Sequence, residues 1–69
     1  MYKRIRDLRE DCDITQGKVA EILNISQPTY SRYESGYLDI PSEMLIKLAK
    51  FYNVSTDYIL ELSDKKNDK

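Results

Sequence analysis

The chain has 69 residues and a net charge of −1, and it is 41% hydrophobic and 33% charged. These values fit one folded domain with a small core better than they fit a disordered chain. The single cysteine, Cys12, excludes an internal disulfide, and no apolar run approaches the length of a membrane span. No signal peptide is apparent, so we expect a cytoplasmic protein that does not contact membranes.

The residue types also argue against an enzyme. Histidine is absent and the thiol is single, so the sequence cannot supply a catalytic triad or a zinc site. No glycine-rich loop that would cradle a phosphate is present. We therefore expect neither catalysis nor a cofactor, and we expect Cys12 to be an inert thiol.

The first predicted helix runs from about Tyr2 to Asp11, because Ile5 and Leu8 fall on one helical stripe. Asp13 is suited to a left-handed C-cap, since Asp tolerates a positive φ better than most residues. The basic side chains of this helix are expected to form a solvated face, with contact to a DNA backbone or a membrane as the alternative. They are Lys3, Arg4 and Arg6.

Two further helices with a tight turn between them are predicted within residues 15–34. Both begin by the same device. Thr15 and Ser26 each offer a hydroxyl N-cap, and each follows an apolar residue, Ile14 or Ile25. Helices that start this close together must cross, and this is the pattern of a DNA-binding helix-turn-helix.

The second of these helices carries its own boundary signals. Pro28 lies in its first turn, where a missing N–H is little loss, and Gly36 ends it after Ser35. Tyr30 and Tyr33 are three residues apart, which favours packing in the core over stacking on bases.

Two helices complete the predicted domain. Pro41-Ser42-Glu43 opens a fourth helix, which Asn53 caps, and Val54-Ser55 opens a fifth that runs to about Leu62. The sequence thus predicts an all-α domain of five short helices over residues 1–62. Residues 63–69 are predicted to form a polar, disordered tail.

Several motifs in register resemble the lambda-repressor-like helix-turn-helix domain, also called the Cro/cI or XRE type. They are LRE, the ITQ start, VAEILNIS, SRYESG, the Pro-Ser helix start, LIKLAKFYNVS and DYIL. The resemblance covers residues 5–60 and implies an orthogonal five-helix bundle. It also implies a transcriptional regulator, most simply a repressor, that binds double-stranded DNA as a homodimer on a near-palindromic operator.

The resemblance further implies that the helix after Ser26 enters the major groove. The implied base contacts are Gln27, Pro28, Thr29, Ser31 and Arg32. Gln can pair with adenine and Arg with guanine through two hydrogen bonds each, so Gln27 and Arg32 are the principal candidates.

Supporting roles follow from the same likeness. Gln16 resembles the family glutamine that contacts a phosphate and braces the recognition helix, and Arg9 and Glu34 should form an internal ion pair. Hydroxyl and backbone N–H groups of Ser35, Tyr37 and Ser42 can also contact phosphates. The first candidate for a dimer interface is the fifth helix, with Ile59, Leu60 and Leu62.

One departure from the family pattern keeps an alternative open. The segment from Ser35 to Ser42 contains no cation and one acid, Asp39, where related repressors often carry Lys or Arg. This loop and the slightly acidic charge favour a protein-interaction module of the same fold, which would bind a partner regulator or a toxin. A phage-type repressor, a restriction-modification controller and an antitoxin are not distinguished by the sequence.

Overall fold

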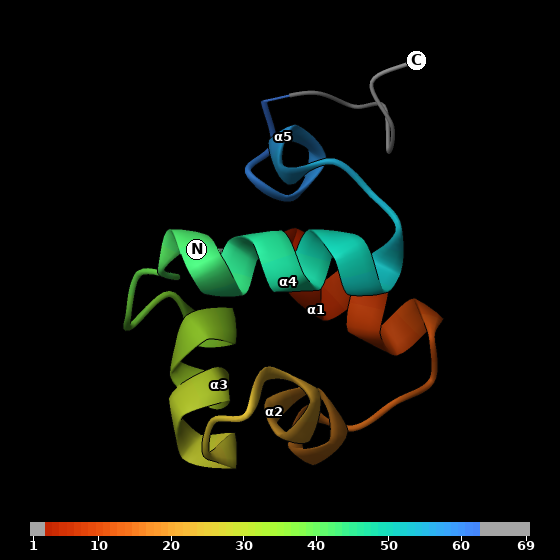
Figure 1. The fold of residues 1–69 in the computed structure, drawn as a ribbon. Coiled ribbons are helices and arrows are strands. Elements are labelled where there is room, and N and C mark those ends of the chain that lie inside the picture. The colour runs from red at the N-terminus through yellow and green to blue at the C-terminus, as the bar shows by residue number, and fades with distance from the viewer. Residues whose placement is uncertain (1–2, 63–69) are drawn as a thin grey trace.

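The computed structural model describes residues 3–62, which form five α-helices and no strand (Figure 1). The helices are α1 (Lys3–Asp11), α2 (Gln16–Leu23), α3 (Gln27–Ser35), α4 (Ser42–Tyr52) and α5 (Thr56–Ile59). Helix α3 crosses the direction of α4, and α2 packs closely on α3. The predicted all-α bundle with a helix-turn-helix is therefore confirmed. None of the helices described is both long and apolar enough to cross a membrane.

Hydroxyl caps begin three of the helices, as the sequence predicted. The side chains of Thr15, Ser26 and Ser55 accept hydrogen bonds from backbone N–H groups of the first turns of α2, α3 and α5. Each cap satisfies a donor that the helix itself leaves without a partner, which fixes where the helix starts.

Four helices are followed, within two residues, by a non-glycine residue in the left-handed region. These residues have φ values between 56° and 62°, and they are Asp13, Asn24, Asn53 and Glu61. The next residue then donates its N–H back to a carbonyl five positions earlier, as in the bonds from Ile25 to Ala20 and from Val54 to Ala49, both 2.9 Å. The left-handed cap predicted at Asp13 and the C-cap predicted at Asn53 are confirmed.

The predicted length of the fifth helix is wrong. Helix α5 ends at Ile59 and not at Leu62, because Glu61 adopts a φ of 62° and Leu62 donates to the carbonyl of Asp57 at 2.8 Å. Glu seldom occupies this conformation, so its residue type did not reveal the helix end. Tyr2 and the predicted tail at 63–69 lie outside the described residues.

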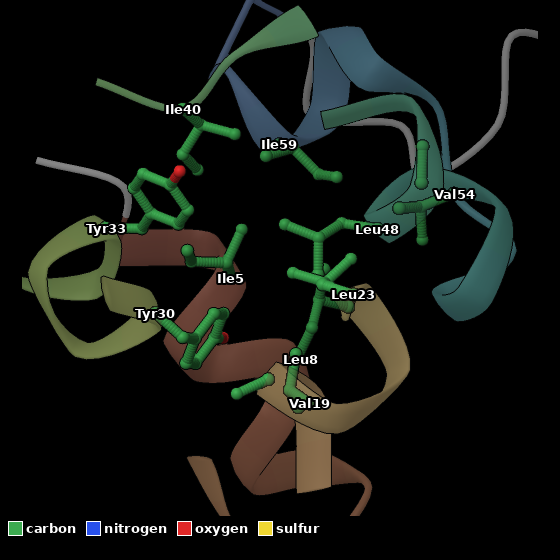
Figure 2. Packing of buried hydrophobic residues seen from close by; sticks show 12 residues of the cluster. Ile5, Leu8, Val19, Leu23, Tyr30, Tyr33, Ile40, Leu48, Val54 and Ile59 are labelled. Carbon is green, nitrogen blue, oxygen red and sulfur yellow. The ribbon is translucent and has the colours of Figure 1, made fainter. Parts of the chain in front are cut away.

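The core joins all five helices and the loop before α4. Its buried members are Ile5, Leu8, Val19, Ala20, Leu23, Tyr30, Tyr33, Ile40, Leu48, Ala49, Val54 and Ile59. Figure 2 shows Tyr30 and Tyr33 pointing from α3 toward Ile5 of α1, which confirms the core assignment of both tyrosines. Because these rings hold one face of α3 inward, the opposite face is presented to solvent.

Candidate nucleic-acid interface

The solvent-facing side of α3 carries the predicted base-reading residues unequally. Gln27, Pro28 and Arg32 are exposed, whereas Thr29 and Ser31 are half-buried. The hydroxyl of Thr29 lies 2.8 Å from the hydroxyl of Ser26, so it belongs to the cap that starts the helix. Gln27, Pro28 and Arg32 are therefore the members of this set best placed to meet a base edge.

A chain of hydrogen bonds connects the start of α3 to its buried end. Arg9 donates to both carboxylate oxygens of Glu34, at 2.7 and 3.3 Å. Gln16 donates its amide to the same carboxylate at 3.0 Å, and Gln27 donates to the amide oxygen of Gln16 at 2.8 Å. The first residues of α2 and α3 are thus bonded to each other, and Glu34 connects them to Arg9 of α1.

The chemistry of Glu34 determines the direction of this chain. A carboxylate only accepts hydrogen bonds, so Gln16 must turn its NH₂ group toward Glu34. The Gln16 oxygen then faces Gln27, which must donate in turn. As a result, the Gln27 amide oxygen and one of its N–H groups have no partner within residues 3–62, and these are the two groups that adenine requires.

Glu34 remains charged although its side chain is only 5% exposed. Burial raises its pKa, but the hydrogen bond and positive charge of Arg9, together with smaller contributions from neighbouring polar side chains, outweigh burial and hold the pKa below the usual range. The same ion pair raises the pKa of Arg9. Arg9 also donates to the carbonyl of Ile14 at 3.0 Å, which ties the end of α1 to the start of α2.

The other predicted phosphate contacts are spread over two places. The Ser35 hydroxyl donates to the carbonyl of Arg32 at 3.1 Å and accepts a hydrogen bond from the N–H of Tyr37. The Ser35 hydroxyl and the Tyr37 N–H are therefore already bonded within the protein. The Tyr37 side chain is 79% exposed. Ser42 lies elsewhere, at the start of α4, where Pro41 provides no side-chain cap and leaves first-turn N–H groups open.

The predicted dimer residues do not share one surface. Ile59 is 1% exposed and belongs to the core, beside the side chains of Ile40 and Leu48 in Figure 2. Its inclusion in an interface is therefore corrected, since a side chain that the core encloses cannot contact a second subunit. Leu60 and Leu62 are 39% and 74% exposed and remain the surface candidates.

Arg4 corrects the expectation of a fully solvated basic face on the first helix. It donates to the carbonyl of Tyr58 at 3.0 Å, and its guanidinium lies 4.3 Å from the centre of the Tyr58 ring. Arg4 therefore joins α1 to α5. The two residues are 54 positions apart, and no local pattern in the sequence links them.

Comparison with known proteins places the chain among helix-turn-helix proteins, whose family model matches residues 5–59. The chain is 43% identical over 68 residues to the HTH-type transcriptional regulator ImmR of Bacillus subtilis, covering 96% of the chain and 54% of ImmR. It is 43% identical over 51 residues to the cryptic phage CTXphi transcriptional repressor RstR of Vibrio cholerae, covering 74% of the chain and 46% of RstR.

A third relative is named as an antitoxin and not as a regulator of transcription. The antitoxin PezA of Streptococcus pneumoniae is 38% identical over 53 residues, covering 77% of the chain and 34% of PezA. The chain thus spans about half the length of ImmR and RstR and a third of PezA.

Proposed function

The chain belongs to the helix-turn-helix family, and from this membership we propose that it is a sequence-specific DNA-binding regulator of transcription. The observation that carries the proposal is the hydrogen-bonded position of Gln27 at the exposed start of α3. A side chain that is already held in place loses less conformational entropy when it binds a base. The names of ImmR and RstR, a transcriptional regulator and a repressor, support the same function.

In this proposal α3 lies in the major groove, with Gln27 and Arg32 as the side chains that read sequence. Gln27 would pair with adenine, and Arg32, between one and two turns further along, with guanine. Pro28 offers only an apolar contact, for example with a thymine methyl group. Each bidentate pair would discriminate against a wrong base by about 1–3 kcal/mol.

The proposed regulator is a repressor that acts as a homodimer. One α3 can reach only a few base pairs, so two copies on half-sites roughly 34 Å apart would supply the required affinity and specificity. The exposed Leu60 and Leu62 are the proposed contacts between copies. Gln16 and the open start of α4 at Ser42 would contact phosphates on either side of the groove.

Selection of bound sequences from random duplex DNA at low salt tests this proposal. We expect an inverted repeat with half-sites one helical turn apart, and we expect the double variant Gln27→Ala/Arg32→Ala to lose it. Lys50→Gln is the matched control, because Lys50 is an exposed cation in the last turn of α4, at the end of that helix farther from α3 in Figure 1. Selection by the double variant as strong as that of the wild type would refute the assignment of the reading residues.

A protein-interaction module is the second candidate function. The net charge of −1 weakens attraction to DNA, and the similarity to an antitoxin points to a protein partner. If the wild-type chain enriches no sequence, this candidate replaces the first. Affinity purification of the chain from its own cells, with Leu62→Lys as control, would then identify a partner.

A further inference from the structure

A pocket of about 240 Å³ opens between α1, the start of α2 and the last turns of α3. Its lining residues are Arg6, Arg9, Gln16, Ser31, Glu34 and Ser35. Four of them already have a role in the hydrogen-bond chain or the loop after α3. The other two are Arg6 and Ser31. The resemblance implied no DNA contact for Arg6, and it implied a contact with a base for Ser31.

The pocket carries a net positive charge. It contains two guanidinium groups and one carboxylate, and the carboxylate of Glu34 is already bonded by Arg9 and Gln16. Glu34 therefore offers little repulsion to an incoming anion. Arg9 still has an N–H on each Nη atom, because its described bonds use Nε, one group on Nη1 and one on Nη2.

Two side chains at the pocket are available to bind an anion. The Ser31 hydroxyl makes no hydrogen bond to any residue in the described range 3–62, although the residue is half-buried. The nearest acid to Arg6 is Glu10, at 3.6 Å, but both side chains are more than half exposed. Such an exposed pair on one helix contributes little and can open at small cost.

We propose that this pocket binds a backbone phosphate of the operator, with Arg6 of α1 and Ser31 of α3 as the donors. The inference rests on the proposed function. Gln16 lines the pocket and also bonds Gln27, so a phosphate there would lie beside the strand whose bases Gln27 reads. This reassigns Ser31 from a base contact to a phosphate contact, and it gives α1 a direct part in binding DNA.

The test compares salt titrations of operator binding for the wild type, Arg6→Gln, Arg6→Lys and Ser31→Ala. Lys50→Gln is again the control with the same change in charge. Arg6→Gln removes one cation from a phosphate and should lower the slope of log K against log salt by about 0.9 per subunit, or ~1.8 per dimer. Ser31→Ala removes only a neutral hydroxyl, so it should weaken binding and leave the slope unchanged. Binding of Arg6→Gln to operator and to unrelated duplex should weaken by the same factor, and Arg6→Lys should restore the slope.

The results separate this inference from the function on which it rests. A lowered slope for Arg6→Gln with an unchanged slope for Lys50→Gln supports the pocket. Equal slopes for Arg6→Gln, Lys50→Gln and the wild type would overturn the pocket and leave the DNA-binding function standing. A wild-type chain that binds neither operator nor unrelated duplex overturns both. Circular dichroism of Arg6→Gln should match the wild type, because the side chain is 64% exposed.

Discussion

Gln27 donates its side-chain amide to the amide oxygen of Gln16 at 2.8 Å. This bond joins the residue proposed to read a base to one proposed to contact a phosphate. The partner that orients Gln16 is Glu34, which Arg9 holds in turn. The orientation of the Gln27 side chain on the proposed DNA-reading surface thus depends on an ion pair at the opposite end of α3.

Gln27→Ala and Gln16→Ala should weaken DNA binding in different ways. Gln27→Ala should lose ~1–3 kcal/mol of discrimination at one base pair of each half-site and leave the salt dependence unchanged. Gln16→Ala should instead weaken binding to the operator and to its single-base variants by the same factor, since it removes a contact with a phosphate. Fluorescence anisotropy on the operator and on single-base variants would measure both. A uniform loss over all bases in Gln27→Ala would contradict its reading role.

Arg9→Ala should destabilise the domain much more than the loss of an exposed ion pair would. Glu34 would be left as a buried carboxylate without its charged partner, at a cost of ~3–5 kcal/mol. The double variant Arg9→Met/Glu34→Leu should recover much of this loss because it removes both charges. Urea unfolding measures the effect, and Arg6→Ala is the exposed-arginine control. A cost for Arg9→Ala as small as that for Arg6→Ala would show that Glu34 tolerates isolation.

Acid should destabilise the protein through Glu34. Its folded pKa lies below the unfolded value of about 4.3, so its stabilising contribution is complete above that value. The contribution is lost as the pH falls through the folded pKa, because the unfolded chain binds the proton more readily. Thermal unfolding between pH 6 and pH 2 should show a shallower decline in Glu34→Gln than in the wild type. Parallel curves would mean that Glu34 does not carry this dependence.

Tyr52→Phe should leave the free energy of unfolding unchanged or raise it by about 1 kcal/mol. The hydroxyl of Tyr52 is buried, and no group within residues 3–62 accepts or donates a hydrogen bond to it. Burial also raises the Tyr52 pKa to about 12, so the wild type should lose stability as the pH rises from the unfolded value of about 10. Tyr52→Phe should lose less over that interval. An equal loss in alkaline urea titrations would count against this assignment.

Ile59 and Leu62 should respond oppositely to truncation. Ile59→Ala should cost ~2–5 kcal/mol of folding stability, because its side chain is enclosed by the core. Leu62→Lys should change stability by less than ~0.5 kcal/mol but weaken association of two copies, since the leucine is 74% exposed. Sedimentation velocity with urea unfolding separates the effects. Unchanged association in Leu62→Lys would remove this residue from the proposed interface.

Most helix boundaries could be predicted from the sequence because their causes are local. A hydroxyl cap acts on an N–H three residues away, and a left-handed Asp or Asn closes the turn that precedes it. The residue types at Thr15, Ser26 and Asn53 therefore indicated these boundaries. The end of α5 was predicted wrongly because Glu61 adopts the left-handed conformation of a C-terminal cap without being a typical cap residue.

The sequence by itself thus determined the order, the starts and most of the ends of the helices, and through its motifs the family. The resemblance already implied the internal ion pair between Arg9 and Glu34, which the structure contains. Only the tertiary structure placed Arg4 over Tyr58, enclosed Ile59 and formed the pocket beside Arg6. The reason is that helical periodicity assigns a residue to a face, whereas burial and partners depend on which other helix covers that face.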